Sequence, residues 1–112
     1  MSASIFPPSS SFEWDPDKDR VNQAKHGVSF ADAEGAFLDQ RRVLHEDVRH
    51  SSSTETRYFC FGMHGGAVLT VRFTYRDGLI RIFGAGYWTK GRHIYEQANQ
   101  IHQRAHRSHE DH

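Results

Sequence analysis

The sequence predicts an α+β domain in which two N-terminal helices and one C-terminal helix pack on an antiparallel β-sheet of three to four strands. Two observations predict this fold class. Helical and strand-like hydrophobic periods occupy separate blocks of the chain, which is typical of α+β folds and not of parallel α/β sheets. In addition, 112 residues is the length of one domain, and 37% hydrophobic with 12% aromatic residues suffices for a small core.

The N-terminal third predicts a tail, a short strand and two helices. Residues 1–11 are rich in serine and proline and predict a flexible tail, and the next three residues are a short strand candidate. The first helix is expected to begin at Pro16, because Asp15 can cap the free backbone N–H groups and Pro16 has no N–H to leave unpaired. It is expected to end at His26. The second helix is expected to begin at Ser29. Its apolar residues have helical spacing: Phe30, Ala33, Phe37 and Leu38.

The rest of the domain predicts strands and a closing helix. Strands are expected at residues 42–47, 57–63, 67–75 and 79–85, with a polar loop at 48–54. Asp77-Gly78 is a hairpin signal between the last two strands. A helix is expected from about Thr89, so the domain would span residues 12–104, followed by a polar, histidine-rich tail at 105–112.

Charge is unevenly distributed along the chain, although 14 Lys and Arg balance 14 Asp and Glu. Residues 12–40 have a net charge of −4, residues 41–92 of +5 and residues 93–112 of −1. A polarised molecule can bind an anion on one side while its total charge is zero. Charge alone does not distinguish this interpretation from chance clustering.

Several classes of protein are excluded by what the sequence lacks. No window is long and apolar enough to span a membrane, and the first residues do not read as a secretory signal, so a soluble, cytoplasmic domain is expected. The single cysteine, Cys60, lies in an apolar strand and is expected to be a buried, inert thiol. The motifs of nucleotide-binding loops, serine hydrolases and zinc proteases are missing, and no cofactor is predicted. Four histidines near the end have spacings that suit Zn²⁺ or Ni²⁺, although a solvated tail is the favoured interpretation: His102, His106, His109 and His112.

Basic and aromatic residues interleave in the strand-rich half of the chain. The basic residues are Arg57, Arg72, Arg76, Arg81, Lys90 and Arg92, and the aromatic ones are Tyr58, Phe73, Tyr75, Phe83, Tyr87 and Trp88. Guanidinium groups bind phosphate and aromatic rings stack on unpaired bases, so the pattern is consistent with a surface for single-stranded RNA. The alternative is that the aromatic residues form the core and the arginines only solubilise the domain. Phe73 and Tyr75 fit this alternative, whereas Arg72 points to the opposite face of its strand.

Cleavage of RNA without a metal needs a group that takes the proton from the 2′-hydroxyl, one that protonates the 5′-oxygen and a cation at the phosphate. His26 follows Lys25 at the end of the first predicted helix, next to Gly27. A histidine at a helix C-terminus is more often a partner of the helix dipole than a catalyst. Its position alone therefore does not assign it a role.

Three segments resemble the BrnT-type toxins of type II toxin–antitoxin systems. They are FEWDPDKDRVNQAKHGVSF at 12–30, FTYRDGLIRI at 73–82, and the pairs TK at 89–90 and YE at 95–96. The resemblance covers about residues 12–101. It implies a RelE-like fold, a metal-independent ribonuclease that arrests growth, and a BrnA-like antitoxin with a ribbon-helix-helix DNA-binding domain. In such systems the toxin–antitoxin complex represses its own operon by binding operator DNA.

The resemblance also implies roles for individual residues. Catalytic roles fall on Lys25 and His26, which match the K-H-G motif, and on Arg57 and Arg81, which match arginines of the central strands. RNA-binding roles are expected for Arg72, Arg76, Lys90, Arg92 and Trp88.

Three positions depart from the family pattern. Gly84 and Gly86 stand where the family usually has serine and arginine, and Arg92 stands where it generally has glutamate. Loss of a guanidinium beside the phosphate would cost on the order of 10²-fold in rate. The departures leave two hypotheses open, an active endoribonuclease and a catalytically attenuated homologue that mainly binds the antitoxin and assists repression.

Overall fold

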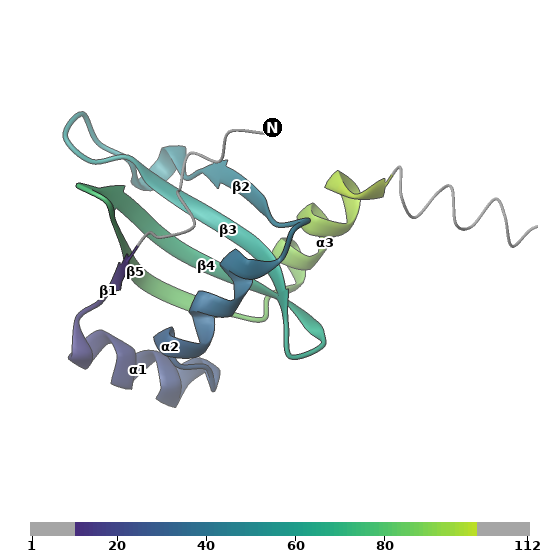
Figure 1. Cartoon of the computed structure of the whole chain (residues 1–112), viewed down its shortest axis with the longest axis horizontal. Helices are drawn as coiled ribbons and strands as arrows, with labels where there is room; N and C mark the ends of the chain where they lie inside the picture. The colour runs from purple at the N-terminus through teal and green to yellow at the C-terminus, as the bar shows by residue number, and fades with distance from the viewer. Residues whose placement is uncertain (1–10, 101–112) are drawn as a thin grey trace, which may run out of the picture.

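A computed structural model describes residues 11–100, which form a five-stranded sheet with helices on both faces (Figure 1). The strands are β1 (Ser11–Glu13), β2 (Val43–Glu46), β3 (Arg57–His64), β4 (Ala67–Arg76) and β5 (Leu79–Gly86). The helices are α1 (Pro16–His26), α2 (Phe30–Ala33) and α3 (Thr89–Ala98), with 3₁₀ helices η1 (Glu34–Leu38) and η2 (Val48–His50). The predicted C-terminal tail and the four histidines near the end of the sequence lie outside the described residues, as does the predicted N-terminal tail except for Ser11, which begins β1.

The sheet has the strand order β1-β5-β4-β3-β2 and is mixed. The four strands predicted at 42–47, 57–63, 67–75 and 79–85 form and pair antiparallel, as β2 to β5. The predicted number of three to four strands was wrong, because β1 adds a fifth strand, which pairs in parallel with the start of β5. Phe12 explains why this short segment joins the sheet. Its ring packs against the core and meets Phe37 edge to face, with ring centroids 5.3 Å apart.

The helical prediction also needs correction. Instead of one second helix there is a single α-helical turn, α2, followed by the 3₁₀ helix η1. The predicted apolar stripe ends early, because Leu38 is 83% exposed. η1 passes so close to β3 that a Cβ added at Gly62 would lie 2.2 Å from the carbonyl oxygen of Ala36, and the side chain of His64 fills the space beside Gly35. Close packing on β3 thus accompanies the change of helix type.

The predicted helix ends, in contrast, are confirmed. Asp15 accepts a hydrogen bond from the N–H of Asp17 (2.9 Å), and Gly27 adopts a left-handed φ of 72° at the end of α1. Ser29 likewise caps α2 by accepting a hydrogen bond from the N–H of Asp32 (3.0 Å).

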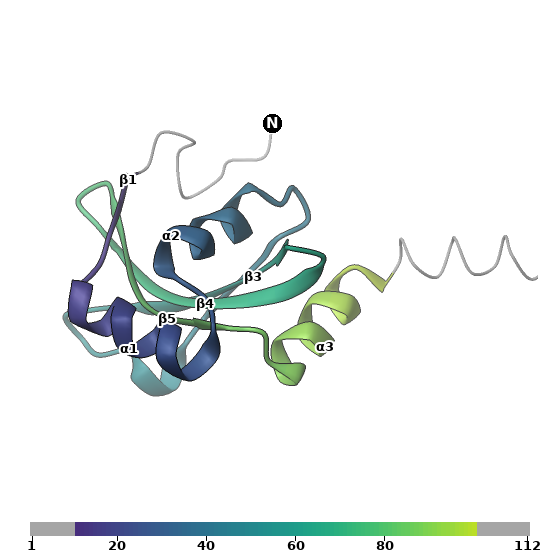
Figure 2. The same cartoon turned by 90° about the horizontal axis from the view of Figure 1, so that it is seen from below.

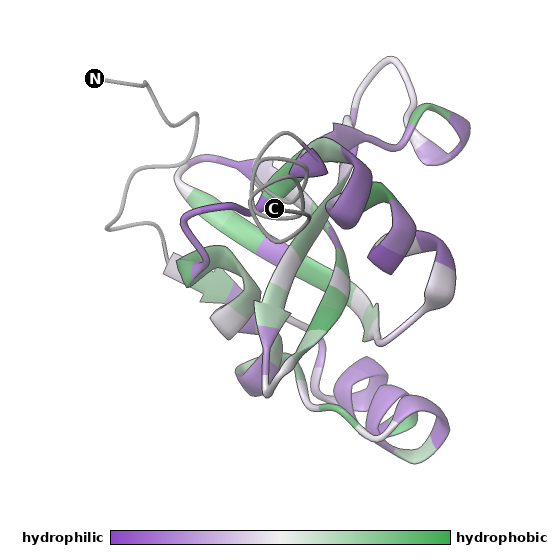
Figure 3. Cartoon of the chain, turned by 90° about the vertical axis from the view of Figure 1, so that its right-hand side faces the viewer, coloured by the Kyte–Doolittle hydropathy of each residue, from purple (hydrophilic) through white to green (hydrophobic). Residues whose placement is uncertain are grey.

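Hydrophobic residues are buried on both faces of the sheet. α2 and η1 cover one face, and α3 lies on the other (Figure 2). The larger core, beneath α2 and η1, includes Phe30, Cys60, Leu69, Val71, Phe73, Ile80 and Ile82. The smaller one joins α3 to the sheet through Phe61, Val68 and Tyr95. Figure 3 shows this distribution, with the hydrophobic colour concentrated in the sheet and α1 largely hydrophilic.

α3 covers only part of its face of the sheet. It packs closely where it crosses β4, because a Cβ added at Gly91 would lie 1.9 Å from Oγ1 of Thr70. The remainder of that face, around Arg57, Arg72 and Phe83, borders α1 and η2 and carries the cavities described below. Within residues 11–100, no helix is long and apolar enough to cross a membrane.

Candidate nucleic-acid-binding and catalytic site

Two adjoining cavities, of about 250 and 270 Å³, open on the face of the sheet that α3 leaves uncovered. Both are lined by Lys18, Arg72 and Phe83. The first is also lined by Asp47, His50, Arg57, Tyr58 and Phe73, and the second by Asp17, Val21, Asn22, Lys25 and His26. We call the two cavities together the basic cleft, since four Lys and Arg side chains and two histidines line it against two aspartates.

α1 is fixed against the sheet by one buried polar side chain. Asn22 is 7% exposed, and its amide nitrogen donates hydrogen bonds to the carbonyl oxygens of Val28 and Ala85, both at 2.9 Å. Its side-chain oxygen accepts from the N–H of Ala85 (3.2 Å). Because β1 pairs only with Leu79–Arg81, this amide takes the place of a neighbouring strand at the far end of β5. The anchor places the last turn of α1, with Lys25 and His26, at the cleft.

Arg72 lies at the centre of the basic cleft, where the two cavities meet. It is exposed, and among residues 11–100 no carboxylate forms an ion pair with it. Opposite Arg72, β5 bulges: Arg72 pairs with Gly84 and Phe73 with Ile82, so that Phe83 is the extra residue. The guanidinium lies against Gly84, where an added Cβ would come within 2.8 Å of Nη2. The absence of a side chain at Gly84 therefore makes room for Arg72.

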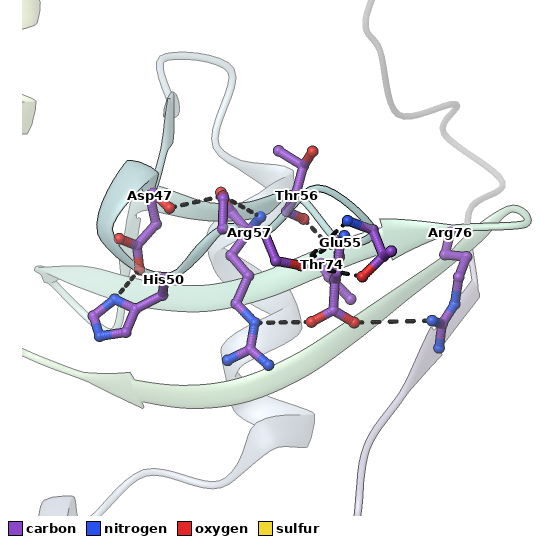
Figure 4. Close-up of polar contacts among 10 residues, drawn as sticks. Asp47, His50, Glu55, Thr56, Arg57, Thr74 and Arg76 are labelled. Carbon is purple, nitrogen blue, oxygen red and sulfur yellow. Dashed lines mark hydrogen bonds and ion pairs between the residues drawn. The ribbon is translucent and has the colours of Figure 1, made fainter.

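Arg57 lines the first cavity, and its predicted catalytic role remains a prediction. Its guanidinium carbon lies 4.1 Å from the centre of the Phe83 ring, a cation–π contact. Its Nε lies 2.9 Å from Oε1 of Glu55, which also pairs with Arg76 at 3.8 Å (Figure 4). The cation is thus held in place by a carboxylate on one side and a ring on the other.

His26 is exposed and meets the indole of Trp88 edge to face, with ring centroids 5.1 Å apart. The indole occupies the space beside Gly86, because an added Cβ there would lie 2.4 Å from the ring. Both glycines that depart from the family pattern are therefore explained by a larger side chain that fills their space. Trp88 lines neither cavity, but it contacts His26, which lines the second cavity.

Four predicted basic residues line neither cavity. Arg81 pairs with Glu13 (3.5 Å), and Arg92 with Glu96 (4.0 Å). Lys90 is exposed near the start of α3, and Arg76 is exposed at the end of β4. Their proposed roles in catalysis and RNA binding remain predictions.

The aromatic residues divide between the two interpretations given above. Phe73 is fully buried, and Tyr58 and Tyr75 pack against the same core, so the core interpretation is confirmed for these three. Phe83 faces the basic cleft, and Trp88 contacts His26 beside it.

Six residues of the cleft were not predicted from the sequence: Asp17, Lys18, Val21, Asn22, Asp47 and His50. Asp47 and His50 fall in a segment that was predicted partly as strand and partly as loop, and they are in fact joined by the turn of η2. Their Oδ2 and Nδ1 atoms are 2.8 Å apart (Figure 4). The spacing of an acid and a histidine three residues apart was a signal that could have identified the pair. Lys18 had no comparable signal, since it lies among other charged residues of α1.

Two other candidate chemistries find no support in the described part of the chain. Burial raises the pKa of Cys60 to about 12, so its thiol is protonated at neutral pH, as expected of an inert residue. No cluster of three or more His, Cys, Asp or Glu side chains suited to a metal ion occurs within residues 11–100.

A family model described as "Ribonuclease toxin, BrnT, of type II toxin-antitoxin system" matches residues 14–91. The chain belongs to this family. The match confirms the resemblance and identifies a ribonuclease toxin of a type II system, with an antitoxin as partner and RNA as target. No curated protein matches the chain. Every residue that lines the basic cleft lies within the matched segment.

Proposed function

We propose that the chain is a cytoplasmic endoribonuclease that binds RNA in the basic cleft, cleaves it without a metal ion and thereby arrests growth. A BrnA-like ribbon-helix-helix antitoxin neutralises it, and the complex represses its operon at operator DNA. The fold is proposed to be related to that of RelE. The observation that carries the proposal is the exposed guanidinium of Arg72, which has no carboxylate partner within residues 11–100 and lies between two cavities with a histidine each.

The cleft supplies the groups that this reaction requires. In the proposed complex Arg72, Lys18 and Arg57 surround the phosphate and offset the charge of the phosphorane. His26 transfers a proton, with Lys25 as a supporting charge. Outside the cleft, Arg81, Arg76, Lys90 and Arg92 would contact the RNA backbone on either side, and the exposed part of Trp88 offers a ring to a base.

The direct test is cleavage of RNA by the purified chain. Wild type is expected to cleave in the presence of EDTA and to leave 2′,3′-cyclic phosphate ends. Arg72→Ala is expected to lower the rate on the order of 10²-fold, because one phosphate-binding cation is lost. Arg41→Ala is the matched control, since Arg41 is exposed and lines neither cavity. Equal rates for Arg72→Ala and wild type would remove the basic cleft from the mechanism.

The alternative is an attenuated homologue whose main work is to bind the antitoxin and assist repression. Gly84 and Gly86 motivate it, because they lack the polar and cationic side chains usual in the family. Expression of the chain alone in a bacterial host distinguishes the two. Growth arrest with loss of RNA supports the endoribonuclease, and normal growth with a soluble, folded product supports the alternative.

A further inference from the structure

One histidine of the basic cleft is held by a buried carboxylate. The side chain of Asp47 is 7% exposed, and its backbone is fixed as well, because its N–H donates to the carbonyl oxygen of Arg57 (2.7 Å) and its carbonyl oxygen accepts from Oγ of Ser51 (2.8 Å). The imidazole of His50 is 56% exposed, and its Nδ1 lies 2.8 Å from Oδ2 of Asp47. The carboxylate is rigid, and the ring that it orients is open to the cleft.

This contact fixes which nitrogen of His50 is available for chemistry. An ionised carboxylate only accepts hydrogen bonds, so Nδ1 of His50 must carry the proton that it shares with Asp47. In the neutral ring Nε2 is then unprotonated and can accept a proton. A histidine oriented in this way is suited to act as a general base.

The second histidine lies in the other cavity. His26 lines one cavity and His50 the other, and both cavities share Arg72. Displacement at phosphorus requires the attacking and leaving oxygens to be roughly in line, so the base and the acid must stand on opposite sides of the phosphate. A phosphate bound at Arg72 would border one cavity that holds His26 and another that holds His50, which is the arrangement that separate base and acid require.

We propose that His50 is the general base of RNA cleavage and that Asp47 is its positioning residue. The inference rests on the proposed function. Nε2 of His50 takes the proton from the 2′-hydroxyl as the 2′-oxygen forms a bond to phosphorus. The bond from phosphorus to the 5′-oxygen breaks with its electron pair, and that oxygen takes a proton from the imidazolium of His26. The products are a 2′,3′-cyclic phosphate and a 5′-hydroxyl.

The test compares two substrates, an RNA oligonucleotide and the same oligonucleotide with sulfur in place of the 5′-bridging oxygen at the bond that wild type cleaves. A thiolate leaves without protonation, so the sulfur substrate needs a base but no acid. His50→Asn is expected to lower kcat by about 10²- to 10⁴-fold on both substrates, while the affinity for RNA changes less than about threefold. His26→Asn is expected to lose activity on the oxygen substrate and to recover most of it on the sulfur substrate.

Asp47→Asn tests the positioning role. It is expected to lower kcat by about 10²-fold with KM nearly unchanged, because the amide no longer enforces the proton on Nδ1. His93→Asn is the matched control, since His93 is an exposed histidine of α3 that lines neither cavity. Should His50→Asn lower the melting temperature, His50→Ala with added imidazole replaces it, and the free base is expected to restore cleavage.

Three results would contradict these proposals. Recovery of activity by His50→Asn on the sulfur substrate would make His50 the general acid and overturn its assignment as the general base. Full activity of His50→Asn on both substrates, with Arg72→Ala inactive, would overturn the inference but leave the proposed function intact. Absence of cleavage by wild type would overturn both.

Discussion

Replacement of Asn22 by alanine tests how α1 is held on the sheet. The side chain makes three hydrogen bonds, one to Val28 and two to Ala85, and is almost fully buried. A buried hydrogen bond contributes about 1 kcal/mol net, and a buried group left without a partner costs about 1–3 kcal/mol. Water can reach part of the site after truncation, so we expect Asn22→Ala to lower the free energy of unfolding by about 3 kcal/mol.

The assay is urea unfolding, followed by thermal melting and amide exchange. A loss of about 3 kcal/mol corresponds to a fall in melting temperature of about 12–24 °C for a domain of this size. The N–H of Ala85 should exchange faster, because its acceptor is gone. Gln23→Ala is the control: the next residue along α1 is exposed, and its replacement is expected to change stability by less than about 0.5 kcal/mol.

Asn22→Asp separates the donor from the acceptor function of the amide. Aspartate keeps an oxygen for the N–H of Ala85 but presents a negative charge to two carbonyl oxygens, so it should be at least as destabilising as alanine. The reasoning is refuted if Asn22→Ala unfolds within 1 kcal/mol of wild type and the exchange of Ala85 is unchanged.

Three further predictions concern the cleft, the response to pH and the cysteine. Gly84→Ala should leave stability nearly unchanged, because only the flexible end of Arg72 has to move, yet lower RNA cleavage by about tenfold; equal cleavage would contradict the contact. Burial raises the pKa of Asp39, but hydrogen bonds from Met63, Tyr95 and Arg41 outweigh it and lower that pKa below 3.8, so the stability that this carboxylate adds should be lost as the pH falls below about 4. Burial and the hydrogen bond to Asp39 raise the pKa of Tyr95 to about 12, so the stability that the protonated phenol adds should be complete below pH 10 and lost between pH 10 and 12. Denaturation curves of wild type and Tyr95→Phe, measured across the acid range of Asp39 and the alkaline range of Tyr95, test the two effects. The thiol of Cys60 should not react with a disulfide reagent at pH 8 until the protein unfolds, and rapid labelling of the native chain would argue against its burial.

Local signals in the sequence predicted local structure well. The caps at Asp15 and Ser29 and the hairpin at Asp77-Gly78 depend on neighbouring residues only, and each forms as expected. The parallel pairing of β1 with β5 joins residues far apart in the chain, which no short pattern encodes. The division of the second helix into α2 and η1 also depends on residues far apart in the chain, since it accompanies the close contact of Ala36 with Gly62 on β3.

The site was predicted in part for the same reason. Arg72 was assigned to the exposed face by strand alternation, and it is exposed in the cleft. His50 was missed because its segment was predicted as a loop, so that its spacing of three residues from Asp47 was not recognised as one turn of η2. The glycine departures at Gly84 and Gly86 suggested a loss of function when read alone, whereas the fold shows what fills the space beside each one.

The walls of the cleft come from three stretches of the chain, ending with Phe83 on the last strand. A nascent chain on the ribosome therefore has no cleft until nearly all of the matched segment has been synthesised, because β5 must dock before its ring can meet Arg57. Under the proposed function, a partly synthesised copy that lacks β5 would therefore lack the Phe83 wall of the basic cleft and would bind RNA less well than the folded domain.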